Sequence, residues 1–410
     1  MLARMEFGTK KRNIGLLVAC IYILLSYIGK QGIIDERLHS LSLYLLIVMC
    51  TMSFVFLGRF KLVNYHAWYI TFITLSIISC LYALDINTAF GSVYNLIVVL
   101  GLTLALTWVI NGEEDIGKIL VCFSLSGFGL FTLLLATNQL FTTDRLGESL
   151  FGNANYFALI VMVSLMSSTW LLLYNPGVKK LLFALCVASE FYLLFLSGGR
   201  KYILVSALFL YILLILKKNK KGKMEVVKYT LVFIFIGIIG YWAMFNIPQL
   251  YNTVGYRMEG VFNIFSGEEK VKLPEDQIRQ NMIIYGLDFF AQRPVFGFGI
   301  DNYKLMYGNI SGNVVYAHNN FIELMVTHGL LGLVLYYSYY IFLIYKLLMD
   351  REDATKLRDF FLAFLICLFP LELGIVSYNM HFIQLLISLG SIYLYMKALK
   401  KKTGTLLFKV

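Results

Sequence analysis

The chain has 410 residues, of which 59% are hydrophobic and only 14% are charged. Soluble domains carry roughly 25% charged residues, so this composition excludes a soluble enzyme, a disordered chain and a small secreted disulfide scaffold. The mean hydropathy of +0.74 indicates an integral membrane protein.

The cysteines do not form a pattern that would bind a metal or build a disulfide framework. All six lie inside apolar runs, where a thiol behaves as a small hydrophobic group. They are Cys20, Cys50, Cys80, Cys122, Cys186 and Cys367. The sequence therefore predicts no metal site, and no cofactor is expected.

Apolar runs along the chain predict twelve membrane-spanning helices. A helix of roughly 20 apolar residues crosses the hydrocarbon core, and lipid offers no partner to an unpaired backbone group, so only helices fit these runs. The predicted spans are residues 14–29, 38–57, 66–84, 89–110, 119–137, 155–174, 180–196, 202–216, 228–245, 320–346, 360–377 and 379–396. No small-residue cleavage site follows the first run, so we expect that span to be retained.

The distribution of positive charge predicts the orientation of these spans. Most of the 35 Lys and Arg residues fall in alternate connections, and the basic runs at 217–221 and 400–402 lie on the same predicted side. Because basic connections stay in the cytoplasm, we expect both termini there and the protein in the cytoplasmic membrane. The net charge of +11 then reflects topology and contact with anionic lipid, and nucleic-acid binding is not indicated.

The predicted organisation is that of an all-α polytopic membrane protein with one large outer loop. Spans one to nine occupy residues 1–245, an extracytoplasmic segment occupies 246–319, spans ten to twelve occupy 320–397, and a basic cytoplasmic tail occupies 398–410. Loops on rigid scaffolds commonly carry function, so we expect the chemistry at the segment 246–319.

Basic residues in this outer segment run against the orientation rule. They are Arg257, Lys270, Lys272, Arg279, Arg293 and Lys304. Residues 277–292 have the spacing of an amphipathic helix, whose apolar stripe consists of Met282, Ile283, Gly286 and Phe290. Arg279 falls on that stripe, where it would either reach a lipid headgroup or hold a phosphate bidentately. An anionic ligand is the simplest reason for these charges.

Histidine supplies the candidate for proton transfer. His318 precedes the tenth span, and an imidazole gains or loses a proton near neutral pH. The alternative is a hydrogen-bonded histidine at an interface. We expect His328, deeper in the same span, to be structural, and Glu323 either to orient a partner or to pair with an arginine.

Two further segments place arginines on the predicted outer face. Arg145 precedes the sixth span, and Arg200 follows the tight turn at 197–199. Glu190 and Glu372 are acids within predicted spans; such acids are functional candidates, and the alternative is a salt bridge that fixes helix packing.

Together these motifs resemble the O-antigen polymerase/O-antigen ligase superfamily. The resemblance rests on Arg279…Arg293-Pro294-x-x-Gly297-x-Gly299-x-x-Asn302-Tyr303…His318-Asn319-Asn320-x-x-x-Glu323…Gly329-x-x-Gly332, within a stretch from about 140 to about 335. Arg145 and Asn155 are similar to the family's Arg…Asn-x-Asn element, although Ala154 stands where proline is common. Ser197-Gly198-Gly199-Arg200 departs from the family's Ser-Arg-Gly order, which leaves the alignment of Arg200 open.

The resemblance implies a GT-C-like glycosyltransferase that works on the outer membrane face by an inverting, metal-independent mechanism. The donor would be a glycan on polyprenyl diphosphate, and the acceptor would be a hydroxyl of a second glycolipid. His318 would be the base, and Arg279 and Arg200 would hold the diphosphate. Substrate contacts are expected from Arg145, Arg293, Arg257, Asn319, Glu323 and Tyr303.

Three functions remain open at this point. We favour a polymerase of lipid-linked repeat units of the capsule, exopolysaccharide or O-antigen type, for which a chain-length regulator is a candidate partner, because residues 318–332 look closer to polymerases than to ligases. A ligase would pass the glycan to a lipid or another acceptor. A glycolipid flippase would also need arginines in a cavity, but it predicts inverted internal repeats, and the sequence shows none.

Overall fold

The computed structural model describes residues 2–28, 36–57, 61–141, 146–218, 223–247, 251, 274–350 and 356–407. Within these ranges the chain is helical and contains no strand. The all-α prediction is therefore confirmed.

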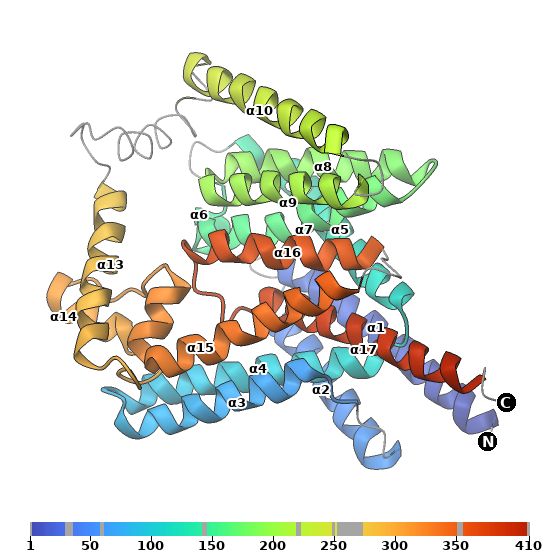
Figure 1. Ribbon diagram of the computed structural model, residues 1–410, viewed down its shortest axis with the longest axis horizontal. Helices are drawn as coiled ribbons and strands as arrows, with labels where there is room; N and C mark the ends of the chain where they lie inside the picture. Colours follow the sequence, from blue (N-terminus) through green and yellow to red (C-terminus); the bar gives the residue numbers. More distant parts are fainter. Residues whose placement is uncertain are drawn as a thin grey trace. The chain divides into compact units, whose positions relative to one another are not determined.

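The chain divides into two compact units. Figure 1 labels their helices in chain order. The first unit consists of Met1–Ala19, Leu41–Ile116 and Ile278–Val410, and the second consists of Cys20–Ser40 and Gly117–Gln277. Helices α1 (Leu2–Ile28) and α2 (Glu36–Leu57) each contribute residues to both units.

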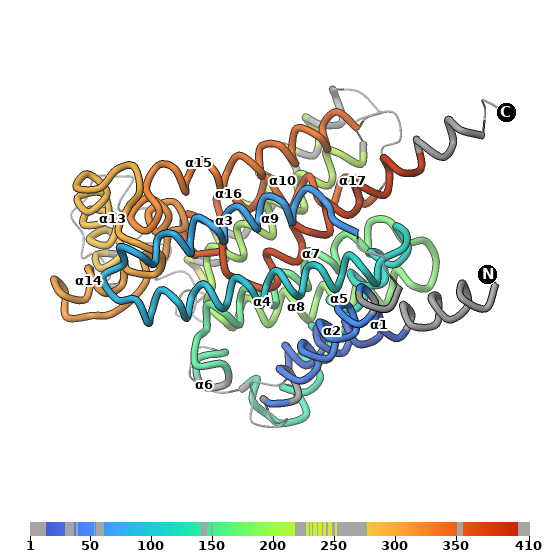
Figure 2. The backbone as a smooth tube through the Cα atoms, turned by 90° about the horizontal axis from the view of Figure 1, so that it is seen from below, coloured from blue at the N-terminus to red at the C-terminus, as the bar shows by residue number. Residues whose placement is uncertain are grey.

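The first unit is built on five long helices. They are α3 (Asn64–Ser79), α4 (Ile86–Val109), α15 (Asn320–Met349), α16 (Lys356–Glu372) and α17 (His381–Leu407). α3 packs against α4, α15 and α17, while α15 also packs against α16 and α17. Two further helices, α13 (Pro274–Gln292) and α14 (Tyr303–Ser311), lie at the end of the unit where α15 begins (Figure 2).

The second unit is centred on one helix. α7 (Ala154–Tyr174) is mostly buried and packs against α6 (Glu148–Phe151), α8 (Lys179–Leu196) and α9 (Arg200–Lys218). α10 (Lys223–Asn246) packs against α9, and α5 (Glu113–Ala136) completes the unit. Asn153 starts α7 by accepting hydrogen bonds from the backbone N–H groups of Asn155 and Tyr156, which satisfies two of the donors that a helix start leaves open.

An aromatic face joins α3 to α15 in the core of the first unit. Tyr65, Trp68 and Phe72 recur at helical spacing on α3, so they line one side of that helix. The Trp68 ring stacks on Tyr339 of α15 with centroids 4.7 Å apart, and its indole N–H donates to the Leu335 carbonyl. Aromatic pairs in this geometry add stabilisation beyond the burial of their area.

Each of the twelve predicted spans overlaps one helix, namely α1 to α5, α7 to α10 or α15 to α17. Six helices of the described part are long and apolar enough to cross a membrane: Asn64–Tyr82, Ile86–Val109, Glu113–Ala136, Ala154–Tyr174, Asn320–Met349 and His381–Lys400. The other crossings, and the outward orientation of the segment 246–319, stay predictions.

One predicted boundary is wrong. The apolar run 360–377 predicted a helix throughout, but α16 ends at Glu372 and residues 373–380 form turns. The backbone N–H of Ser377 donates to Asn320 Oδ1 at 3.0 Å, so a side chain of α15 takes the donor that a continuing helix would use internally.

Candidate active site

The candidate site lies at the end of the first unit where α13, α14 and the start of α15 meet. A buried cluster joins these three helices and consists of Met282, Phe289, Phe298, Tyr303, Tyr307, Ala317, Ile322 and Val326. Gly286 permits the close packing of α13 on α15, because a Cβ there would lie 2.3 Å from Ile322 Cγ2. The cluster therefore fixes Arg279, one turn before Met282, and His318, next to Ala317, on one body.

Helix α15 is interrupted at Gly329, and a neighbouring segment supplies hydrogen-bond partners for the backbone groups that the interruption leaves open. Gly329 has φ 65° and ψ −164°, which only glycine adopts readily. Residues 294–299 run beside the break, and their backbone replaces the lost helical partners. Phe298 N–H donates to Val326 O at 2.8 Å, Gly299 N–H to Thr327 O at 2.9 Å, and Leu330 N–H to Pro294 O at 2.7 Å.

The glycines of the two motifs are explained by this backbone-to-backbone contact. A Cβ on Gly297 would lie 2.5 Å from Val326 O, and a Cβ on Gly329 would lie 2.3 Å from Val295 O. Gly299 meets the end of α3 in the same way, since a Cβ would lie 2.9 Å from Ser79 O. The Gly-x-Gly pattern thus allows the backbone of residues 297–299 to lie directly against the backbones of α15 and of the end of α3.

His318 sits in a turn that is held from both sides. Its φ of 52° lies in the left-handed region, which side chains other than glycine rarely adopt. On one side, Glu323 Oε2 accepts a hydrogen bond from Ala317 N–H at 2.9 Å. On the other, Asn319 Oδ1 caps α15 by accepting from Phe321 N–H and Ile322 N–H. Non-glycine residues held in this way cluster at functional sites.

The His318 side chain is half-buried and lies against Tyr316, with ring centroids 4.1 Å apart. A half-buried imidazole is open enough to meet a substrate and is oriented by its neighbours. This arrangement suits an imidazole that must meet one hydroxyl group in one direction.

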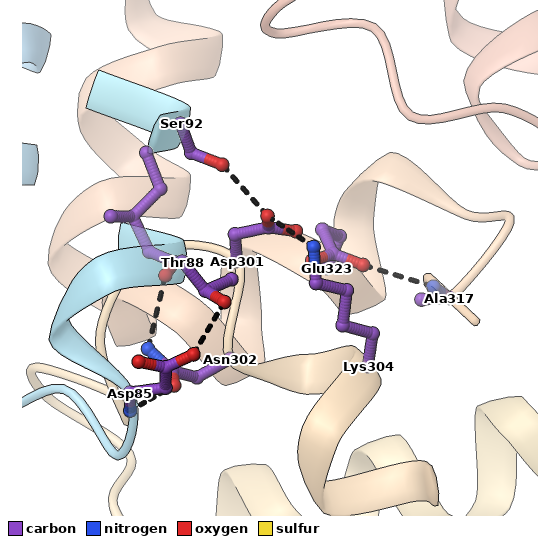
Figure 3. A network of polar contacts seen from close by, with 9 residues as sticks. Asp85, Thr88, Ser92, Asp301, Asn302, Lys304, Ala317 and Glu323 are labelled. Atoms are coloured by element: carbon purple, nitrogen blue, oxygen red, sulfur yellow. Dashed lines mark hydrogen bonds and ion pairs between the residues drawn. The ribbon is translucent and has the colours of Figure 1, made fainter. Parts of the chain in front are cut away.

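A network of charged and polar side chains lies next to this turn (Figure 3). Asp301, whose φ is 60°, accepts hydrogen bonds at 2.7 Å from both Ser92 Oγ and Lys304 Nζ. Lys304 and Asp301 form an ion pair with about a third and a fifth of their side chains exposed. Asn302 ties the network to α4, because its Oδ1 accepts from the backbone N–H of Asp85 at 3.0 Å.

Asp85 starts α4 within the same network. Its carboxylate accepts from Thr88 Oγ1 at 2.6 Å and from Asn87 N–H at 3.0 Å. These two hydrogen bonds, the one from Thr88 first, lower the pKa of Asp85 below its usual value. The carboxylate therefore stays charged, which also suits its position at a helix start.

Glu323 is the second acid beside the turn and is almost fully enclosed, with 1% of its surface exposed. Its Oε1 has no hydrogen-bond partner among the residues that the structure describes. Lys304 extends toward Asp301 and Glu323 in Figure 3. The site therefore combines three carboxyl groups, from Asp85, Asp301 and Glu323, with one ammonium group and one imidazole.

The arginines of the first unit take different positions. Arg279 is half-buried on the stripe of α13 that faces the cluster. That stripe runs through Met282, Gly286 and Phe289; Ile283, which we expected on it, is exposed. Arg293 is exposed, and its guanidinium lies 4.7 Å from the centre of the Phe298 ring.

Arg200 belongs to the second unit, where it begins α9 after a tight turn. Gly198 has φ 63°, and a Cβ on Gly199 would lie 3.0 Å from Ala158 Cβ on α7, so both glycines are needed for the turn to pack. Arg200 is half-buried. Arg145 and Arg257 lie outside the described residues, so a shared pocket for the arginines of both units stays a prediction.

Besides Glu323, two other residues expected to contact substrate are enclosed in the protein. Tyr303 is fully buried in the cluster, and its hydroxyl donates to Met282 O at 2.7 Å. Burial raises the pKa of this phenol, so the hydroxyl stays protonated and holds α14 to α13. Asn319 is buried and uses its side-chain oxygen as the cap of α15. Tyr303 and Asn319 therefore hold the helices around the site in place.

The histidine and the acids within the predicted spans have distinct surroundings. His328 is buried, with Nε2 3.0 Å from Ser76 Oγ on α3 and Nδ1 2.9 Å from Thr327 Oγ1, which fits the structural role expected of it. Glu372 accepts hydrogen bonds from tyrosine and serine hydroxyls. These hydroxyl groups take the place of the basic partner that a salt bridge would need. Glu190 is buried in the second unit, and neither carboxylate oxygen has a partner within the described ranges.

The sequence did not single out Asp301, Lys304, Asp85 or Ser92 as a group. Asp301 and Lys304 are close in sequence to Gly299, but Asp85 and Ser92 come from α4, more than 200 residues earlier. The only local signal was an acid, Asp301, two residues after the last glycine of Gly-x-Gly. No group of three or more metal-ligating side chains appears in the part of the chain that was described.

With this geometry in place, comparison with known protein families gives one match. Residues 181–337 match the family model described as O-antigen ligase. This stretch is similar to the O-antigen ligase family, and it is called the O-antigen ligase-type domain from this point on. It supports assignment to the O-antigen polymerase/ligase superfamily, whose members are glycosyltransferase-like enzymes acting on lipid-linked glycans. No curated protein matches the chain.

The matched stretch runs from the start of α8 to the middle of α15. It contains Arg200, Arg279, Arg293, His318 and Glu323, and it includes the whole of the repaired break around Gly329. The O-antigen ligase-type domain therefore holds the candidate base and most of the candidate cationic groups.

Proposed function

We propose that this protein transfers a glycan from polyprenyl diphosphate to a hydroxyl group of a second glycolipid, at the outer face of the cytoplasmic membrane. The observation that carries the proposal is the O-antigen ligase-type domain over residues 181–337, together with the clamped, half-buried His318 that it contains. The expected product is a longer lipid-linked chain, as made by a repeat-unit polymerase.

In this reaction the acceptor oxygen forms a bond to the anomeric carbon while the bond from that carbon to the diphosphate breaks. The electron pair leaves with the diphosphate, and the acceptor proton passes to His318. Attack from the face opposite the leaving group inverts the anomeric centre. General-base catalysis of this kind contributes roughly 10²–10⁴-fold to a rate.

The leaving diphosphate needs positive charge, because negative charge grows on its bridging oxygen as the glycosidic bond breaks. Guanidinium groups stay charged, bind phosphate oxygens bidentately and act strongly where water is excluded. Arg279 and Arg200 are the proposed diphosphate contacts, and Arg293, Arg145 and Arg257 are the proposed supporting ones.

The Asp301 carboxylate is poorly suited to diphosphate, because like charges repel. Carboxylates instead accept hydrogen bonds from sugar hydroxyls. The side of the site next to His318 is therefore proposed for the acceptor glycan, with Glu323 orienting the His318 turn from behind.

Purified protein reconstituted with lipid-linked repeat units tests the proposal. We expect chain lengthening, measured on gels or by mass spectrometry, and its loss by about 10²–10⁴-fold in His318→Ala. His381→Ala is the matched control, since His381 is also half-buried but lies at the start of α17. Normal lengthening in both His318→Ala and Arg279→Ala would refute the assignment.

Ligation is the second candidate, because the matching family is described as O-antigen ligase. The same assay separates the two activities. Transfer only to an added lipopolysaccharide core, without longer lipid-linked chains, would establish a ligase in place of a polymerase. Movement of lipid across the membrane by His318→Ala at the wild-type rate, without any glycosyl transfer by either protein, would favour a flippase.

A further inference from the structure

A hollow lies beside the segment that repairs α15, on the first unit. Its volume is about 360 Å³, and its lining is formed by Tyr82, Arg293, Pro294, Val295, Phe296 and Gly297. The walls are apolar apart from one guanidinium group and one phenol, and the lining contains no acid. An occupant with an anionic head and a hydrocarbon tail would match this lining.

The hollow is placed at a membrane boundary. Tyr82 is the last residue of the candidate span Asn64–Tyr82, and tyrosines at such positions lie at the level of lipid headgroups. Large apolar side chains around it are exposed: Leu81, Leu84, Ile86, Val295, Phe296, Leu330 and Leu331. A hydrocarbon chain that left the hollow would therefore meet an apolar surface.

The polar groups of the hollow suit a phosphate and little else. Tyr82 donates its hydroxyl hydrogen to Phe296 O at 3.0 Å, so this phenol is already engaged. Arg293 is exposed and stacked on Phe298, which leaves the edge of its planar guanidinium directed away from the ring. The glycerol and headgroup hydroxyls of a phospholipid would need further polar partners, which this lining does not supply.

We infer that this hollow binds an isoprenoid phosphate at the junction between its phosphate and its first isoprene units. Arg293 meets the phosphate, while Val295 and Phe296 contact the branched hydrocarbon. The inference rests on the proposed function for the identity of the lipid, and it deepens that function by naming where the carrier chain enters. The backbone of the same segment pairs with residues 326–331 of α15, the helix that His318 precedes. The lipid-binding segment and His318 are therefore both held by α15.

The test is a binding measurement that needs no turnover. Protein in nanodiscs of phosphatidylcholine is incubated with a long-chain polyprenyl monophosphate that carries a photoreactive group in its first isoprene unit. After illumination, mass spectrometry maps the labelled residues. We expect label on Tyr82, Val295 or Phe296, and competition by unlabelled polyprenyl phosphate.

Two variants and a matched control sharpen this test. Arg293→Gln and Phe296→Ser should each weaken labelling by about tenfold, as loss of one charge-assisted contact or one apolar contact predicts. Phe90→Ser is the control, because Phe90 on α4 has 53% of its surface exposed, similar to the 58% of Phe296, but lies outside the lining. Its labelling should equal that of the wild type.

Two outcomes would overturn the inference. One is competition by phosphatidylglycerol as strong as that by polyprenyl phosphate, which would make the hollow a general lipid site. The other is labelling that maps elsewhere or is unchanged in both variants. Failure of the proposed function would look different, since chain lengthening would then be missing while the labelling and its loss in the two variants persisted.

Discussion

Two buried carboxylates of the first unit differ in how their oxygens are satisfied. Glu372, at the end of α16, accepts from Tyr337 at 2.8 Å, from Tyr340 at 3.0 Å and from Ser377. Glu323, in the first turn of α15, accepts from one backbone N–H, and its Oε1 has no partner within the described residues. Both side chains are enclosed, so burial alone does not separate them.

The difference teaches what each acid does for the protein. A buried polar group with all its hydrogen bonds made fixes the packing around it, and removing it leaves several partners unsatisfied. Glu372 holds α15, α16 and the turn at 373–380 together in this way. Glu323 holds a single turn, the one that presents His318, and keeps one oxygen facing the charged network.

The largest expected effect that separates the two acids is on stability. Glu372→Ala should lower the free energy of unfolding by about 3 kcal/mol, because it leaves the hydroxyls of Tyr337, Tyr340 and Ser377 without their acceptor and opens a cavity. Glu323→Ala removes one backbone hydrogen bond and should cost about 1–2 kcal/mol. Denaturant titration of both variants in the same detergent measures the two values.

An equal loss of stability in the two variants would contradict this comparison. Phe369→Ala serves as a control for simple loss of volume near Glu372, since Phe369 stacks on Tyr337 but makes no hydrogen bond to the carboxylate. If Phe369→Ala were as destabilising as Glu372→Ala, the hydrogen-bond network would not be the cause.

The sequence predicted the helices well, because their signal is local. Twelve apolar runs correspond to twelve helices, because a single apolar segment in lipid can satisfy all its backbone hydrogen bonds only as a helix. The exception is the end of α16, beyond which Ser377 N–H donates to the side chain of Asn320, 57 residues away. A pattern of neighbouring residues cannot predict a partner so distant in the sequence.

The candidate site was predicted only in part, for the same physical reason. Arg279 and His318 could be proposed from the sequence, because a charge on an apolar stripe and a histidine just before a predicted span are both visible there. The network of Asp301, Lys304 and Ser92 was not, because Ser92 reaches it from α4. The glycines of the motif were seen, but their close contact with α15 depends on the break at Gly329.

The next effect concerns activity at Glu323. Glu323→Gln keeps an amide oxygen that can accept from Ala317 N–H, so the His318 turn should stay in place and stability should change by less than about 1 kcal/mol. Replacement of the carboxyl group by an amide should still lower chain-lengthening activity by about tenfold, because the polar surroundings of the base change. Initial rates at several pH values measure the effect, with the pH profile of Glu323→Gln displaced from that of the wild type.

A second variant separates the carboxyl group from the hydrogen bond that it accepts. Glu323→Ala removes both, so its activity should fall further than that of Glu323→Gln. Equal activities of the two variants would show that the hydrogen bond to Ala317 is unimportant for the His318 turn. An undisturbed pH profile in Glu323→Gln would show that the carboxyl group does not affect the base.

The smallest effect is expected at the rim of the network, in the pH dependence contributed by Asp85. Its pKa in the folded protein lies below the usual value of 3.8, chiefly because of the hydrogen bond from Thr88. A depressed pKa contributes stability that is fully present above the unfolded value and is lost as pH falls through the folded value. Asp85→Asn should therefore lower the thermal midpoint slightly at pH 6, and the difference from the wild type should shrink only below pH 3.8, as the pH falls through the lower pKa of the folded protein. Asp288→Asn, on the exposed side of α13, is the control and should not reproduce this pattern. A difference that stayed constant at every pH below 3.8 at which the protein stays folded would mean that Asp85 acts through its shape as a helix cap, as Asn also can, and that its charge has no part in joining α4 to the site.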